Sequence, residues 1–168
     1  MKVKETIAFI GEADKTCSNL IQKLAAESYP LVLVTKEGNH FEDLSRQILN
    51  HIPDADIETI SCAHEGCWEA DIIVFDNLNF DPGFSEKIKE VANQKILVYF
   101  LNKENQSSIL MEEIKSFRQL LPNTEWVEVI FDPVSEEMHI TGADEATVII
   151  ENIFNQAGYT TSLLKAIA

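Results

Sequence analysis

The sequence is short of several residue types, and each shortage argues against a class of protein. Three cysteines, an odd number in a chain of 168 residues, argue against a disulfide-stapled secreted domain and favour a reducing cytoplasm. No apolar run approaches the roughly 18 residues of a membrane span, and we expect no signal peptide at the N-terminus. Basic residues number 13 against 28 acidic ones. The net charge of −15 argues against nucleic acid or an anionic membrane as a partner.

The acidic charge is unevenly distributed along the chain. Residues 1–50 have a net charge of −1, and residues 51–168 have a net charge of −14. The N-terminal part is therefore the one that would not strongly repel an anionic ligand. A simpler interpretation is that the acidic surface only keeps the protein soluble.

Apolar runs alternate with helical patterns along the whole chain. Four runs are apolar on consecutive residues, as in parallel strands that lie under helices on both faces: 7–10, 31–34, 72–75 and 96–101. Weaker strands are expected at 57–60, 125–131, 138–141 and 159–163. Helical patterns fall between them, at 14–28, 41–51, 84–91, 109–121 and 143–155, with a short helical turn at 62–68. The pattern predicts one α/β domain over residues 1–168, with a doubly wound, mostly parallel sheet of the Rossmann type.

The turn after the first strand stands where such folds place a dinucleotide pyrophosphate. The fingerprint of that turn, G-x-G-x-x-G, reads here Gly11-Glu12-Ala13-Asp14-Lys15-Thr16, so only the first glycine is kept. Ala13 puts a methyl group where the backbone must approach the pyrophosphate. Asp14 can cap the following helix, where its carboxylate would compete with a phosphate for the same partial positive charge.

Segments over nearly the whole chain resemble, in the right order, the Rossmann domain of the deazaflavin-dependent NADP reductases. Besides residues 7–24, they are Glu69-Ala70-Asp71-Ile72-Ile73-Val74, Leu120-Leu121-Pro122-Asn123, Thr141-Gly142-Ala143-Asp144 and Phe154-Asn155-Gln156-Ala157-Gly158-Tyr159. The 6-phosphogluconate dehydrogenase and pyrroline-5-carboxylate reductase groups are more distant relatives. The resemblance implies an NADP-linked oxidoreductase in which hydride passes directly between two bound cofactors, so no acid–base residue is required.

The sequence departs from that family's pattern at the positions where the family binds its cofactor. The segment Phe75-Asp76-Asn77-Leu78 replaces a turn of small residues and proline beside the nicotinamide, and Asn102-Lys103-Glu104 replaces T/S-N-P. We also expect no counterpart here of the helical domain of the dehydrogenase relatives. These departures favour an alternative, a non-catalytic binding or scaffold module that has lost the cofactor.

Candidate cofactor residues lie at the expected carboxyl ends of strands, where ligands bind in open parallel sheets. Gly11, Glu12, Ala13 and Asp14 would act through backbone amides. Thr35-Lys36 ends the second strand about 25 residues past Gly11, and a small polar plus basic pair favours a 2′-phosphate, hence NADP over NAD. Arg46 could reach the same phosphate. Asp76 and Asn77 would lie near the reactive ring. Alternatively, Lys36 is an ordinary surface lysine, Gly11 only ends a strand, and Asp76 and Asn77 belong to an ordinary polar loop.

Other reactive groups do not assemble into a motif. Cys62, His64 and Cys67 have the spacing i, i+2 and i+5, but structural zinc requires four ligands and no second pair is present, so we predict no metal. The four histidines are scattered, and no catalytic residue can be assigned. The apolar segment 159–168 should be an edge element that packs on the body or meets a second copy of the chain, as in a homodimer.

Overall fold

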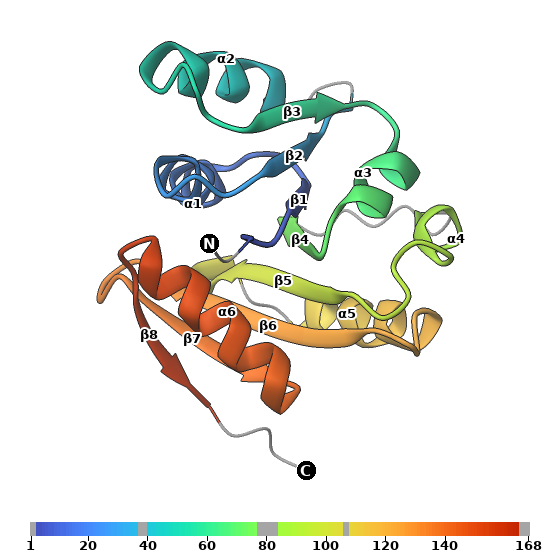
Figure 1. Ribbon diagram of the computed structural model, residues 1–168. Helices are drawn as coiled ribbons and strands as arrows, with labels where there is room; N and C mark the ends of the chain where they lie inside the picture. Colours follow the sequence, from blue (N-terminus) through green and yellow to red (C-terminus); the bar gives the residue numbers. More distant parts are fainter. Residues whose placement is uncertain (1–2, 37–39, 77–83, 106–107, 165–168) are drawn as a thin grey trace.

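The computed structural model describes residues 3–36, 40–76, 84–105 and 108–164. Its centre is an eight-stranded sheet in the order β3-β2-β1-β4-β5-β6-β7-β8 (Figure 1). The strands are β1 Ile7–Ile10, β2 Leu31–Val34, β3 Ile57–Ile60, β4 Ile72–Asp76, β5 Ile96–Asn102, β6 Glu125–Asp132, β7 Glu137–Gly142 and β8 Thr160–Leu163. The doubly wound sheet expected from the alternating pattern is confirmed.

All neighbouring strands are parallel except β6 and β7, which are antiparallel. The chain winds outward from β1 to β3, then returns and winds the other way from β4. Strand β1 therefore has β2 on one side and β4 on the other, and Ile10 pairs with both Val34 and Phe75. In such a sheet the strand order reverses between β1 and β4, which is where ligands bind in open α/β folds.

Helices cover both faces of the sheet. They are α1 Lys15–Ala26, α2 Phe41–His51, α3 Ala63–Glu69, α4 Phe84–Ile88, α5 Ser108–Leu120 and α6 Asp144–Gln156, with a 3₁₀ turn η1 at Lys103–Asn105. Buried side chains of α1, α2 and α6 share one hydrophobic core, and those of α3, α4 and α5 belong to a second core across the sheet. Strands β2 and β4 are buried along their whole length, because both of their faces lie under helices.

Local sequence explains why α1 forms where it does. Apolar residues at helical spacing form the face of α1 that packs on the sheet: Cys17, Leu20, Ile21 and Leu24 are each 0% exposed. Burying a leucine or isoleucine side chain contributes about 1.5–3 kcal/mol, so this face fixes the helix on the sheet. The Asp14 side chain accepts a hydrogen bond from the Cys17 amide at 2.8 Å, which confirms the predicted cap.

One helix is shorter than the expected pattern. Helix α4 ends at Ile88, and Val91, expected on its buried face, is buried in the turn that follows, where its amide bonds to the Ile88 carbonyl. The expected helix length depended only on the apolar pattern of residues 84–91. That pattern does not distinguish a residue buried on a helix from one buried in the turn that follows it. Helix α6 ends at a glycine: Gly158 follows the cap residue Ala157 and has a φ of +97°.

The far end of the sheet is an edge strand, as expected. Within the described part of the chain, strand β8 pairs with β7 alone, and Leu163 and Leu164 are 44% and 49% exposed. The remainder of the predicted apolar tail, 165–168, lies outside the described residues. A homodimer through this edge stays a prediction. Within the described segments, no helix has the length and apolar character needed to cross a bilayer.

Candidate functional site

The loop between β1 and α1 is shaped by its contact with the end of β4. Gly11 has a φ of +154°, and a Cβ built on it would lie 1.9 Å from the carbonyl oxygen of Asp76. No other residue fits at such a distance. The glycine kept from the dinucleotide fingerprint is therefore required by the packing of the loop on β4, independently of any ligand.

The next part of the loop turns its amides toward the protein interior. Ala13 adopts a left-handed φ of +60°, which costs an L-residue roughly 1–2 kcal/mol. Its amide donates to Oδ2 of Asp76 at 3.0 Å, and the amide of Asp14 donates to the same oxygen at 3.3 Å. The Asp76 residue is 1% exposed. A buried carboxylate thus accepts both amides at the position where the fold usually presents amides to a pyrophosphate.

The surroundings of Asp76 oppose its negative charge. Burial is the largest effect and Asp14 the next, and together they raise the pKa of the Asp76 carboxyl from 3.8 to about 7. Hydrogen bonds from the Asp14 amide, the Cys17 thiol and the Ala13 amide act in the opposite direction. Burial and the nearby Asp76 and Asp14 also raise the pKa of Cys17, so its thiol stays protonated. The carboxyl of Asp76 therefore titrates near neutral pH.

The first turn of α1 has two further backbone amides that could donate to a ligand. Asp14 caps the amide of Cys17, and within the described residues the amides of Lys15 and Thr16 donate to no acceptor. Unsatisfied amides at a helix N-terminus attract anions. The side chain of Thr16 lies beside the end of β5, where Asn102 Nδ2 donates to its Oγ1 at 3.4 Å.

The end of β2 lies next to the same loop. Lys36 Nζ is 3.0 Å from Glu12 Oε1, and the side chains are 52% and 31% exposed. Thr35 is half-buried, and its amide donates to the Ile60 carbonyl at 2.8 Å. Two segments predicted to share a ligand, 11–14 and 35–36, are therefore neighbours at the carboxyl edge of the sheet. The positive charge of Lys36 is paired with an acid of the loop.

The remaining predicted positions lie apart from this group or outside the description. Arg46 is on the exposed surface of α2 and forms an ion pair with Asp43, three residues earlier. Asn77 lies outside the described residues. Asp76, predicted to lie near the reactive ring, is buried, and its carboxylate accepts a hydrogen bond from the Ala13 amide of the loop.

This contact is what sequence reasoning missed. The sequence indicates only Asp14 as a carboxylate that competes with a phosphate. Asp76 also accepts backbone amides of this loop, from Ala13 and Asp14, which are 63 and 62 residues away in the sequence. One feature of the sequence could have indicated this contact. The order β2-β1-β4 sets the end of β4 against Gly11, and an acid there replaces a small residue of the resembled family.

The cysteine and histidine pattern forms no metal-binding cluster in the part of the chain that is described, where no three His, Cys, Asp or Glu residues come together. Cys62 is exposed and Cys67 is buried. His139 Nδ1 and Ser162 Oγ are hydrogen-bonded at 2.8 Å between strands β7 and β8, which are several strands away from β1 in the sheet.

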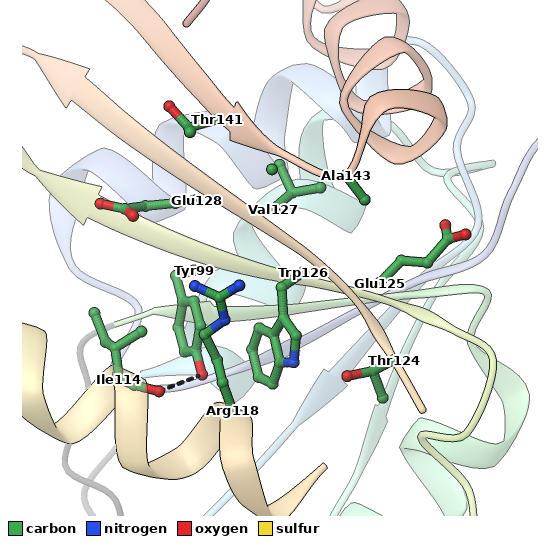
Figure 2. A pocket seen from close by; sticks show the side chains of 11 residues that line it. Tyr99, Ile114, Arg118, Thr124, Glu125, Trp126, Val127, Glu128, Thr141 and Ala143 are labelled. Atoms are coloured by element: carbon green, nitrogen blue, oxygen red, sulfur yellow. Dashed lines mark hydrogen bonds between the residues drawn. The ribbon is translucent and has the colours of Figure 1, made fainter. Parts of the chain in front are cut away.

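A pocket of about 370 Å³ lies elsewhere, between α5 and the strands β5, β6 and β7 (Figure 2). The rings of Tyr99 and Trp126 stack there with centroids 4.4 Å apart and planes 7° apart. Arg118 projects from α5 across these rings, toward the side of Glu128. Burial raises the pKa of Glu128, and Arg118 partly offsets the effect. Trp126 Nε1 is buried and has no acceptor among the residues that the structure describes, and no candidate residue predicted from the sequence lines this pocket.

Comparison with known proteins identifies similar solved structures. No family model matches the chain, and no curated protein matches it in sequence. An imine reductase variant from Myxococcus stipitatus in complex with NAD+ is 16% identical with a TM-score of 0.67, covering 96% of this chain and 55% of its own. A protein assigned as an F420-dependent NADP reductase, from Arthrobacter, is 15% identical with a TM-score of 0.65, covering 96% of this chain and 84% of its own.

A hypothetical protein from Sinorhizobium meliloti is 13% identical with a TM-score of 0.68, covering 96% of this chain and 85% of its own. The chain spans about 55% of the length of the imine reductase. At these identities the likeness shows the fold, which is that of the Rossmann domains of NAD(P)-dependent reductases. The fold expected from the resemblance to deazaflavin-dependent NADP reductases is confirmed.

Proposed function

We propose that this chain binds a nicotinamide dinucleotide, NADP in preference to NAD, at the carboxyl edge of β1, β2 and β4. The observation that supports this most is the position of Lys36 beside the β1–α1 loop, at the point where the strand order reverses. Several structures with the same fold hold NAD+ or NADP+.

In this proposal the adenosine 2′-phosphate lies by Lys36 and Thr35, at the end of β2. The pyrophosphate takes the amides of Lys15 and Thr16, which have no acceptor among the described residues. The loop 11–14 supplies the close backbone surface, with the buried carboxyl of Asp76 beneath it. The bound nucleotide would supply hydride chemistry, and these residues would hold it in place.

An oxidoreductase activity extends this proposal. In the resembled deazaflavin-dependent reductases hydride passes directly between two cofactors, so the lack of an assigned acid–base residue is compatible with such a reaction. The second redox partner would bind at the same edge of the sheet, next to the nicotinamide.

A second candidate function is a non-catalytic binding or scaffold module with this fold. It is favoured by the occupation of the Ala13 and Asp14 amides by Asp76, and by the pairing of Lys36 with Glu12. In both contacts a side chain of the protein itself, Asp76 or Glu12, occupies a position that a dinucleotide phosphate would use.

Thermal unfolding with about 1 mM NADP, NADPH, NAD or NADH separates the two candidates. A ligand at 100 times its Kd adds about 2.7 kcal/mol, which raises the Tm by several degrees. We expect a rise with the NADP pair that Lys36→Glu removes. Lys23→Glu is a matched control, because Lys23 lies over the ring of Tyr159 near the other end of α1. The absence of a shift with all four nucleotides in the wild-type chain would support the scaffold function.

A further inference from the structure

A buried acid, Asp76, accepts hydrogen bonds from the backbone of the β1–α1 loop. Resting on the proposed function, we propose that Asp76 is an internal competitor for the nucleotide phosphate, which restrains binding as long as its carboxylate is ionised and bonded to the loop amides.

The geometry of the carboxylate is that of a bound anion. One oxygen accepts from two consecutive amides, at 3.0 Å from Ala13 and 3.3 Å from Asp14, in a loop whose left-handed residue turns those amides inward. Successive backbone N–H groups arranged around one anion form the type of nest that binds phosphates. A nucleotide phosphate that approaches the loop meets amides already taken by a fixed, covalently attached anion.

The competition is also electrostatic. On the α1 side Asp76 faces the carboxylate of Asp14 and the thiol of Cys17, and its neighbour on β5 is the uncharged Phe100. Within the described residues no cation forms an ion pair with Asp76. An ionised Asp76 therefore adds a second negative charge, next to Asp14, underneath the place where a pyrophosphate would lie.

Protonation of Asp76 removes that charge. Burial and Asp14 bring the pKa of this carboxyl to about 7, so the charge is lost as the pH falls through neutrality. Nucleotide affinity should then rise as the pH falls, in the opposite direction to a site that depends only on phosphate ionisation. A phosphate monoester loses charge below its second pKa of about 6, which weakens its attraction to Lys36 at low pH.

The test measures the affinity of the full chain for NADP and NAD by calorimetric titration between pH 6.5 and 8.5. NAD is included because it has no phosphate monoester that titrates in this range. The variant Asp76→Asn keeps the shape of the side chain and removes its charge. The matched control is Asp71→Asn, because Asp71 immediately precedes β4, at the opposite end of that strand from Asp76, and its carboxylate also accepts a backbone amide, that of Thr6, at 2.9 Å.

We expect wild-type affinity for both nucleotides to be about tenfold higher at pH 6.5 than at pH 8.5, as for loss of one nearby charge. Asp76→Asn should bind at least as tightly as the low-pH wild type at every pH, and Asp71→Asn should follow the wild type. Binding that is equal in wild type and Asp76→Asn, with no pH dependence, would overturn the inference and leave the proposed function intact. If neither binds at any pH, both fail. Should Asp76→Asn not fold, the pH dependence of the wild type decides alone.

Discussion

Gly11 and Asp76 are in backbone contact: a Cβ at residue 11 would lie 1.9 Å from the Asp76 carbonyl oxygen and 2.8 Å from its carbonyl carbon. The contact joins the exit of β1 to the end of β4, and it places the Asp76 carboxylate under the amides of the following loop. One close approach therefore sets both the path of the loop and the position of the buried acid.

The first prediction concerns this approach. Gly11→Ala should lower the free energy of unfolding by more than about 3 kcal/mol, because the added Cβ meets backbone that cannot move away and the φ of +154° disfavours any side chain. Gly158→Ala is the matched control, since its φ of +97° is also unfavourable but nothing lies within 4 Å. That variant should lose only about 1–2 kcal/mol. Urea denaturation measures both, and equal losses would show that the contact with β4 is not the cause.

The second prediction follows from the buried carboxyl. Its pKa is raised to about 7 in the folded chain from 3.8, so the native state binds an extra proton between these values. This contribution to stability is full below about pH 4 and is lost as the pH rises through 7. Between pH 5.5 and 8, the wild type should lose about 2 kcal/mol of unfolding free energy relative to Asp76→Asn, as measured by urea denaturation at each pH. A constant difference between the two proteins would mean that Asp76 titrates at its ordinary pKa.

Much of this architecture could be predicted from the residue pattern. The runs from Ile7 and Ile72 are apolar on consecutive residues because both faces of β1 and β4 are covered, and the face of α1 around Leu20 shows in its spacing. Asp14 was also predictable as a cap, because capping depends on residues three positions apart.

The role of Asp76 could not be predicted in the same way. Its partners are 62 and 63 residues distant, and the contact depends on which strand lies beside β1 and on the left-handed backbone of Ala13, a residue that rarely adopts it. The pairing of Lys36 with Glu12 likewise depends on two loops meeting at one edge. The local spacing of apolar residues indicates which face of a helix or strand is buried. It does not indicate which polar residues meet when they are distant in the sequence.

The third prediction tests the cation at the end of β2. Glu12→Gln should strengthen NADP binding about three- to tenfold, because it releases Lys36 and removes a carboxylate beside the phosphate site. The effect on NAD should be smaller, since NAD lacks the 2′-phosphate. Stability should change little, because exposed ion pairs contribute less than about 1 kcal/mol. Asp132→Asn is the control: it breaks the similar Lys103–Asp132 pair, at 3.2 Å, with the same change in charge. Equal gains in the two variants would mean that net charge, and not Lys36, is responsible.

The fourth prediction concerns the three thiols, which the structure places in different environments. Cys62 is exposed, whereas Cys17 and Cys67 are buried. Burial raises the pKa of Cys67 to about 12, with Lys95 acting against it, and burial also raises that of Cys17. Since the thiolate is the reactive form, Cys62 should react with a thiol reagent at pH 8 at least about a hundredfold faster than the other two.

The measurement is a time course with an aromatic disulfide reagent, on the native chain and in denaturant. One thiol should react in the fast phase of the native protein and three should react after unfolding. Cys62→Ser should abolish the fast phase, and Cys67→Ser, in the same short segment, should leave it. A fast phase of two thiols in the wild type would place Cys67 at the surface, and would contradict the packing of α3 against β1 and β2 on which the second hydrophobic core depends.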